Sequence, residues 1–429
     1  MKYAFINGVL LSGKEDMEPL CGKVVLTDGE KIEKIADSGA SLDGYEVIDL
    51  KGAYLLPGLI DLHVHLATSG KPPKRDKKPP NYKLLFDVLS KNKLALAVIK
   101  KLTANYAETE LMSGVTTIRT VAGILDMDAR VRDDINAGKL TGPRILSANT
   151  GISVPGGHFA GSIATEASSP EEAREHVRQI ASTKPDLIKL MITGGVMDSS
   201  EEGEPGVLRM PPEIVRAACE EAHLLGYKVA AHVESPEGVR VALENGVDTV
   251  EHGAKPDDEI IRLFKEKGAA LICTISPALP YADFELSESH ALPIAKKNGK
   301  IVMDGVIDCA IKCRSEGIPV GMGNDVGCPF VLHYNFWREL CYFHKYLGAS
   351  NAETLYTATL GNAKIAGIDR ETGSIEEGKS ADMIVVKNDP LKDLSALRDV
   401  SMVVMKGKVI KDPKVKKMKD VDALLDKYM

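Results

Sequence analysis

The middle of the chain alternates short apolar runs with longer amphipathic segments. Apolar runs separated by helical patterns are typical of βα units, in which parallel strands form the interior and helices cover them. Eight runs qualify as strands: 59–63, 115–119, 144–148, 187–191, 228–232, 248–252, 269–275 and 318–322. Eight such units predict an α/β fold, a distorted (β/α)8 TIM barrel.

Both ends of the chain have a different pattern, of short strand-like runs without intervening helical segments. Residues 1–56 contain alternating apolar runs interrupted by Asn-Gly and Asp-Gly, which favour hairpins. Residues 371–429 also contain strand-like runs joined by glycine turns. We therefore predict a small, discontinuous β-sandwich domain built from 1–56 and 371–429, beside a barrel domain that comprises 57–370.

One segment fits neither pattern. Residues 67–82 are rich in proline and lysine and show no periodicity, so we expect an exposed loop after the first barrel strand. The alternative is a lid whose positive charge attracts acidic substrates.

Composition narrows the classes of partner. The net charge of −7 gives no reason to expect a nucleic-acid partner. No apolar run approaches the roughly 18 residues that span a bilayer, and the N-terminus lacks the regions of a signal peptide. We expect a cytoplasmic homo-oligomer that acts on a small-molecule substrate. The seven cysteines contain no C-x-x-C pair. Cys309 and Cys313 could share a helix face, but buried reduced thiols are favoured over a redox or zinc pair.

The candidate chemistry gathers where the predicted strands end. In a (β/α)8 barrel these carboxyl ends converge on one face, which is where active sites form. His63-x-His65 has the spacing of two, which points both imidazoles to one side of a strand. A single histidine or lysine at a strand end usually has a structural role, but so many polar residues at one barrel end favour a shared site. The residues concerned are His63, His65, Lys189, His232, His252 and Asp325.

The motifs around these residues resemble a known family. LPGLIDLHVHL, IKLMITGG, AAHVES, VEHGA and GNDVG, followed by GSIEEGKSADMIVV, are similar to motifs of the amidohydrolase superfamily. The pattern most resembles the branch of imidazolonepropionase-like proteins and metal-dependent prolidases or Xaa-Arg/Lys dipeptidases. The resemblance covers nearly the whole chain, including both β-rich ends.

The resemblance implies a binuclear metal centre. His63, His65 and Asp325 would bind the first ion, and His232 and His252 the second. Lys189, carboxylated by carbon dioxide to a carbamate, would bridge both. Two divalent ions are expected, with zinc the first choice and iron, manganese or cobalt as alternatives.

The resemblance also implies a reaction. A hydroxide that bridges the two ions would attack an amide carbonyl, with Asp325 as general acid and base. His158, in SVPGGHFAG, matches the position that hydrogen-bonds the carbonyl oxygen in related dipeptidases. The substrate would be a dipeptide, an N-acyl amino acid or a cyclic amide.

One residue departs from the dipeptidase pattern. Where those relatives carry a tyrosine two residues after the fifth-strand histidine, this chain has Glu234. A carboxylate facing the substrate would disfavour a substrate carboxylate and favour a cation or a hydrogen-bond donor. The alternative is that Glu234 pairs with a nearby lysine or arginine, for example one from the 71–78 loop, which contains Lys71, Lys74, Arg75, Lys77 and Lys78.

Two other functions compete with amide hydrolysis. A deaminase of the same superfamily would act on an aminated heterocycle, but its single-metal members lack the bridging lysine that Lys189 would supply. A non-catalytic scaffold would keep the fold and lose activity. The presence of every ligand type together with Asp325 weighs against it.

Overall fold

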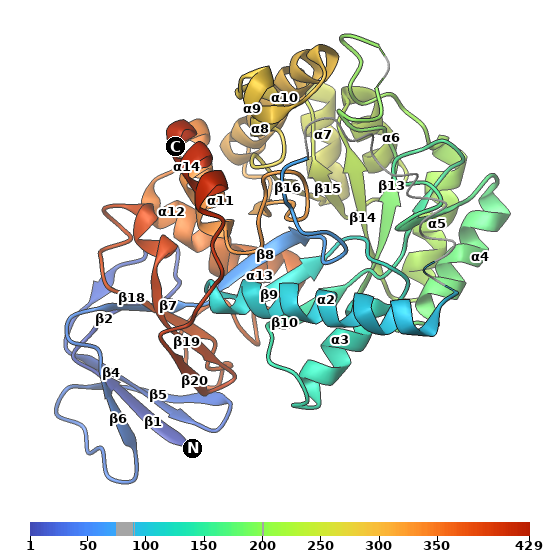
Figure 1. Ribbon diagram of the computed structural model, residues 1–429. Helices are drawn as coiled ribbons and strands as arrows, with labels where there is room; N and C mark the ends of the chain where they lie inside the picture. The colour runs from blue at the N-terminus through green and yellow to red at the C-terminus, as the bar shows by residue number, and fades with distance from the viewer. Residues whose placement is uncertain (74–88, 90, 200) are drawn as a thin grey trace.

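The computed structural model describes residues 1–73, 89, 91–199 and 201–429 and confirms the predicted α/β barrel (Figure 1). Each of the eight predicted strands forms within two residues of its expected bounds. These strands are β8 (Leu59–Val64), β9 (Val115–Thr120), β10 (Arg144–Ser147), β13 (Leu187–Met191), β14 (Lys228–Val233), β15 (Thr249–His252), β16 (Ala270–Cys273) and β17 (Val320–Met322).

Helices cover the outside of the barrel and begin where the sequence supplies capping groups. Ser169 caps α4 and Asp257 caps α7, each accepting a backbone N–H of the first turn, and α7 ends at Gly268 with φ 64°. The helices are α2 (Lys93–Met112), α3 (Met127–Asn136), α4 (Pro170–Ala181), α5 (Pro212–Leu224), α6 (Pro236–Glu244), α7 (Asp258–Lys267), α8 (Leu279–Ala282), α9 (Leu286–Ser289), α10 (Pro293–Ser315), α11 (Phe336–Leu347), α12 (Asn351–Tyr356), α13 (Asn362–Ala366) and α14 (Lys419–Leu425).

The barrel is irregular at its third strand. β10 pairs with β9, but this strand ends at Ser147. A separate short strand, β11 (Gly151–Ser153), continues the barrel by pairing with β13, between Ile152 and Leu190. A further short strand, β12 (Ala164–Glu166), pairs with β11. The barrel is therefore distorted, as predicted, but the sequence analysis did not locate the distortion at the third strand.

Closure of the barrel brings its first and last strands together. The Nδ2 of Asn362 donates to the carbonyl oxygens of Ile60 at 2.7 Å and Met322 at 2.8 Å, joining β8 to β17. Beyond the strand ends, the backbone N–H of Asp325 donates to the His63 carbonyl at 2.9 Å. The loop that carries Asp325 is therefore fixed directly to the strand that carries His63.

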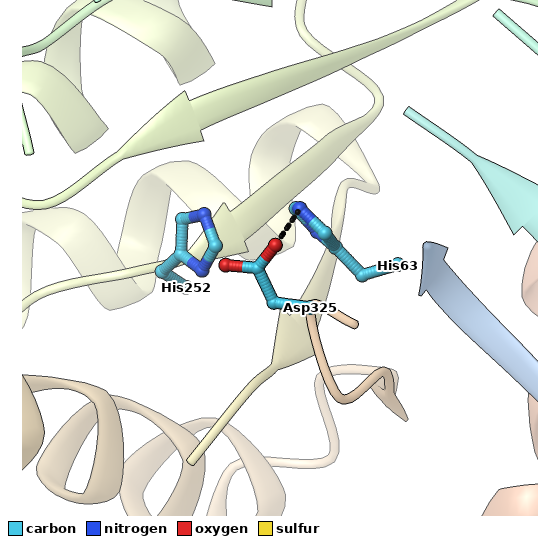
Figure 2. Close-up of side chains that lie close together, drawn as sticks. All are labelled: His63, His252 and Asp325. Atoms are coloured by element: carbon cyan, nitrogen blue, oxygen red, sulfur yellow. Dashed lines mark ion pairs between the residues drawn. The ribbon is translucent and has the colours of Figure 1, made fainter. Parts of the chain in front are cut away.

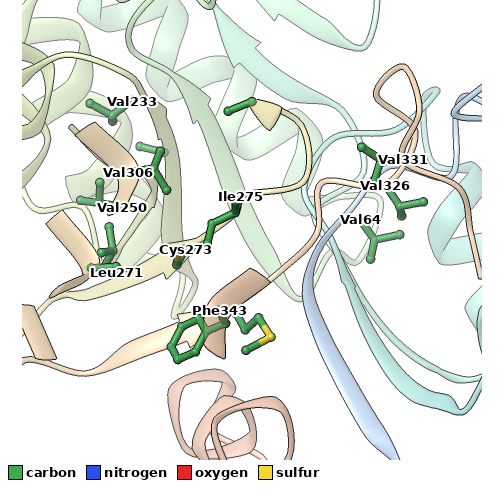
Figure 3. Close-up of a cluster of buried hydrophobic side chains, with 14 of the residues drawn as sticks. Val64, Val233, Val250, Leu271, Cys273, Ile275, Val306, Val326, Val331 and Phe343 are labelled. Atoms are coloured by element: carbon green, nitrogen blue, oxygen red, sulfur yellow. The ribbon is translucent and has the colours of Figure 1, made fainter. Parts of the chain in front are cut away.

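The strands are buried on both faces, as expected for a parallel sheet covered by helices. All six residues of β8 and all six of β9 are buried. Figure 3 shows part of the main core, where Val250, Leu271 and Cys273 of neighbouring strands pack near Val306 of α10 and Phe343 of α11. This packing makes the strand ends a rigid frame for the site.

The chain ends form two sheets beside the barrel (Figure 1). A separate core lies between these sheets and includes Phe5, Val25 and Met383, so the predicted sandwich is present. The domain boundaries at 56 and 371 stay a prediction. One sheet contains β1 (Lys2–Ile6), β4 (Lys23–Asp28), β5 (Lys31–Asp37) and β6 (Glu46–Asp49), and the other β2 (Val9–Leu11), β3 (Pro19–Leu20), β7 (Tyr54–Pro57), β18 (Met383–Val386), β19 (Val400–Met405) and β20 (Lys408–Lys411).

The last helix follows the sandwich strands in sequence but packs on the barrel. α14 lies beside α11 in Figure 1, and the guanidinium of buried Arg338 on α11 lies 2.6 Å from a carboxylate oxygen of Asp426, just after α14. Val421 and Leu425 of α14 belong to the main core. The C-terminal segment therefore contributes to both parts of the fold.

Three further predictions concern single features. All seven cysteines are free, and Cys309 and Cys313 are buried on α10. None of the helices in the described ranges combines the length and the apolar character that crossing a bilayer requires. Of the predicted 67–82 loop, residues 74–82 lie outside the described part, and Thr68 in the described part donates to the Gly327 carbonyl at 2.6 Å.

Candidate metal centre

The six residues singled out at strand ends meet at one end of the barrel. His63 lies in β8 with His65 just beyond it, Lys189 lies in β13, and Asp325 follows β17 by three residues. The two others, His232 in β14 and His252 at the end of β15, complete the set. Each of the six is at most 7% exposed, so the cluster is enclosed by protein.

The side chains approach one another closely enough to share metal ions. Figure 2 shows Asp325 between His63 and His252, and the Oδ1 of Asp325 lies 3.5 Å from the Nε2 of His63. Ligand atoms of these three residues all lie within 4.8 Å of one another. A second group with the same property combines His232, Glu234 and His252. His252 belongs to both groups, so two ion positions would be adjacent.

Each imidazole is held by the protein through one nitrogen. The Nδ1 of His63 lies 2.7 Å from a carboxylate oxygen of Glu251, and the Nδ1 of His65 lies 3.0 Å from the Ala122 carbonyl. The Nδ1 of His252 lies 2.7 Å from the Thr274 hydroxyl, and the Nε2 of His232 lies 3.2 Å from the Gly194 carbonyl oxygen. The other nitrogen of each ring stays available as a ligand. Such outer contacts commonly orient metal-binding histidines.

Lys189 is the most unusual member of the cluster. Its side chain is 1% exposed, and its Nζ has no hydrogen-bond partner among the described residues. Burial lowers the pKa of Lys189 to about 8. A buried ammonium without a partner is costly, whereas a neutral amine can react with carbon dioxide. The site thus fits a carboxylated lysine better than a free one.

Electrostatics also favour bound cations. Burial lowers the pKa of His63 to about 4 and holds the pKa values of His232 and His252 well below 6.5, so these rings are neutral ligands at neutral pH. Burial opposes ionisation of Asp325, but the surrounding histidines hold its pKa well below the usual value. Neutral imidazoles with a carboxylate form a donor set that suits divalent zinc. The residues present therefore fit two divalent ions.

The backbone at two of the ligands is strained. His252 and Asp325 adopt φ values of 68° and 54°, in the left-handed region that residues other than glycine rarely occupy. Strain of this kind persists where the surrounding structure fixes it, and it clusters at functional sites.

Comparison with known proteins identifies the family. Residues 54–410 match the model of the amidohydrolase family. The chain belongs to this family. It is a metal-dependent hydrolase whose His/Asp cluster is typical of a metal site in this family, and the predicted superfamily is confirmed.

Solved structures agree with the predicted branch. A candidate prolidase from Bifidobacterium longum is 36% identical, with a TM-score of 0.87 over 100% of this chain and 99% of that one. A Xaa-Pro dipeptidase with methionine bound in its active site is 29% identical, with a TM-score of 0.83 over 96% of this chain and 100% of that one.

Relatives found by sequence are more distant. Ochratoxinase from Aspergillus niger is 27% identical over 337 residues, 71% of this chain and 67% of that protein. Imidazolonepropionase from Thermoplasma acidophilum is 25% identical over 412 residues, 90% of this chain and 88% of that one.

Two further predicted residues of this amidohydrolase border the cluster. The ring of His158 stacks on that of His232, with centroids 4.2 Å apart and planes 10° apart. Glu234 lies beside the cluster, and one of its oxygens accepts the backbone N–H of Val196 at 3.1 Å. Burial, with the carboxylates of Asp325 and Asp198, raises the pKa of Glu234 to about 8. Their predicted roles remain predictions.

The alternative role for Glu234 is an ion pair with a nearby basic residue, for example one from the 71–78 loop. Among the described residues Glu234 forms no ion pair with Lys71 or with another basic side chain. The other four basic residues of that alternative, Lys74, Arg75, Lys77 and Lys78, lie outside the described residues. The raised pKa of Glu234 is that of a carboxyl group without a basic partner, and a bound cation would favour its ionised form.

The sequence analysis missed the residues that hold His63. The guanidinium of Arg119 donates to both oxygens of Glu251, at 2.7 Å and 2.8 Å, and Glu251 contacts His63. Glu251 is fully buried and Arg119 is 4% exposed. Burial alone would raise the pKa of Glu251, but Arg119 and His63 hold it below the usual value. A charged residue inside each of two buried strands was the available signal, because such charges are rarely unpaired.

Proposed function

We propose that this amidohydrolase uses two divalent ions to cleave an amide C–N bond of a small molecule. The observation that supports the proposal most strongly is the buried, unpartnered Nζ of Lys189 among four anchored imidazoles. A carbamate formed there would bear a negative charge and two oxygens, one for each ion. His63, His65 and Asp325 would hold the first ion, and His232 and His252 the second.

The chain's own residues would supply proton transfer and orientation. When bound, the ions would polarise a carbonyl group and lower the pKa of a water molecule to about 7. Asp325 would accept a proton from the attacking water and deliver it to the leaving nitrogen. His158 would donate a hydrogen bond to the carbonyl oxygen from its Nε2. A C–O bond forms, the C–N bond breaks and one proton of the water moves to the leaving nitrogen, so the immediate products are a carboxylic acid and an amine; the acid then gives its proton to the amine or to solvent.

The substrate class follows from the relatives and from Glu234. Prolidase and dipeptidase neighbours support a dipeptide or an N-acyl amino acid, and imidazolonepropionase supports a cyclic amide. Glu234 has no basic partner among the described residues, and it would favour substrates with an amine, a guanidinium or an amide donor near the second ion.

A substrate screen tests the proposal. Zinc-loaded protein is incubated with dipeptides, N-acyl amino acids, lactams and aminated heterocycles, and new amines, carboxylates and ammonia are measured. We expect amine release from at least one amide series. Ammonia released only from heterocycles would support a deaminase, and no turnover in any series would support a scaffold; either result would contradict the proposal. The predicted homo-oligomeric state and cytoplasmic location stay predictions.

A further inference from the structure

A carboxylate outside the predicted site contacts His158. His158 lies in the loop between β11 and β12, and Asp198 lies in the loop that follows β13. The Nδ1 of His158 is 2.5 Å from the Oδ2 of Asp198. The same oxygen accepts the backbone N–H of Gly195 at 2.9 Å. One carboxylate oxygen thus fixes the imidazole and its own loop together.

This contact determines the role of each nitrogen of the His158 ring. Burial opposes ionisation of Asp198, but the bond from His158 and the N–H of Gly195 keep its pKa below the usual value. An ionised carboxylate can only accept hydrogen bonds, so the Nδ1 of His158 must be the donor. The atom left for a substrate is therefore the Nε2, which can donate to a carbonyl oxygen only in the imidazolium form, where both ring nitrogens carry hydrogen and the Asp198 carboxylate offsets the positive charge.

Packing restricts the ring of His158. One face lies against His232 at a centroid distance of 4.2 Å. Gly195 lies so close to the ring that an added Cβ would be 3.2 Å from the Cε1 of His158, tighter than ordinary packing. Asp198 then fixes the rotation of the ring within its plane. The plane of the ring and its rotation are therefore set before a substrate binds.

We propose that Asp198 is a positioning residue, which holds the Nδ1 of His158 so that its Nε2 faces the carbonyl oxygen of the substrate. This inference rests on the proposed function, because it requires that His158 act on that carbonyl. Preorganised donors of this kind contribute to the transition state without reorganisation during the reaction. Asp198 itself does not contact the reacting atoms.

Substitutions at Asp198 test whether this residue positions His158 or only stabilises the fold. Asp198→Ala removes the acceptor, and we expect kcat to fall about 100-fold with little change in KM, because a misplaced group costs rate at this scale. Asp198→Asn keeps an oxygen that can accept from both His158 and Gly195, and should recover at least tenfold of that loss. Zinc content should match that of the wild type in both variants, since neither removes a proposed ligand.

The chain offers a matched control. The Oδ2 of Asp248 also accepts from a histidine, the Nε2 of His223 at 2.8 Å, and from a backbone N–H, that of Val229 at 2.7 Å. This pair lies where β14 begins, at the end of the barrel opposite the metal cluster. Asp248→Ala and Asp248→Asn should leave kcat unchanged.

A double-mutant cycle tests whether Asp198 affects kcat through His158. In a His158→Asn background, Asp198→Ala should cause no further loss of kcat, because both residues act through one imidazole. A further tenfold loss in that background, or unchanged kcat in Asp198→Ala alone, would overturn the proposal. Unchanged kcat in His158→Asn would instead refute the carbonyl role assigned to His158 under the proposed function.

A spectroscopic measurement tests the pair without a substrate. In zinc-loaded protein labelled with 15N-histidine, the His158 ring should show hydrogen on both Nδ1 and Nε2, and this signature should disappear in Asp198→Ala. His158→Asn assigns the signal. Hydrogen on only one of the two nitrogens in the wild type would contradict the inference, even if the proposed amidase activity had been confirmed.

Discussion

Glu251 connects the metal cluster to the interior of the barrel, and its replacement by glutamine gives a quantitative test. Its carboxylate accepts from the Arg119 guanidinium at 2.7 Å and 2.8 Å and from the Thr249 hydroxyl at 2.8 Å. Its Oε2 also lies 2.7 Å from the Nδ1 of His63. Glu251→Gln keeps the shape but turns one acceptor into a donor, which must face the N–H of Arg119 or of His63.

Two losses should follow from this change. The Arg119 guanidinium stays buried without a counter-charge, and breaking a buried ion pair costs about 3–5 kcal/mol of unfolding free energy. The His63 ring also loses a fixed partner, and removing an outer contact of this kind typically weakens metal binding by about 10- to 100-fold. The first loss concerns the metal-free protein, and the second concerns the ion that His63 would hold.

The two losses are measured separately. Urea unfolding of the chelated protein gives the free energy of unfolding, and competition with a chromophoric chelator gives the zinc affinity. Glu221→Gln is the control, because Glu221 also binds an arginine through two bonds, from Arg178 at 2.8 Å and 3.1 Å. That arginine is 55% exposed, so solvent screens the pair and the control should lose much less stability than Glu251→Gln. Equal stability and zinc affinity in Glu251→Gln and the control would refute the reasoning.

Substitutions at three further positions test the remaining roles. Lys189→Ala should lose most bound metal and activity, and a small carboxylic acid in the buffer should restore part of both; a variant that keeps its metal and full rate would contradict the carbamate. Asp325→Asn should lower kcat by about 100-fold or more, whereas a raised KM with unchanged kcat would make it a binding residue. Glu234→Gln should reduce kcat/KM for cationic substrates by roughly 1–3 kcal/mol and spare neutral ones. Glu234→Tyr should shift preference toward dipeptides with a free carboxylate, and unchanged selectivity in both variants would show that Glu234 is structural.

The barrel and the predicted ligands could be located from the sequence because their signals are local. An apolar run marks a buried strand, and the position of His63 or His252 at the end of such a run follows from the run itself. Parallel topology then requires that these ends share one face of the barrel. No knowledge of individual side-chain contacts is needed for this step.

The supporting contacts depend on tertiary structure and could not be located in the same way. Arg119 and Glu251 are 132 residues apart, and their pairing depends on how two strands face each other across the barrel interior. Asp198 lies in a loop without periodicity, and only the fold places it beside His158. The sequence gives no local signal that α14 packs on the barrel, because its contact there joins Asp422 to Arg338 of α11, 84 residues away in the sequence.

Metal content measured together with turnover tests the central claim most directly. Purified protein is analysed for bound divalent ions as isolated, after chelation and after zinc is restored, and amide hydrolysis is measured on the same three samples. We expect close to two ions per chain, loss of turnover with loss of the ions, and recovery of both on reconstitution. An enzyme that hydrolyses amides at full rate without metal would contradict the account.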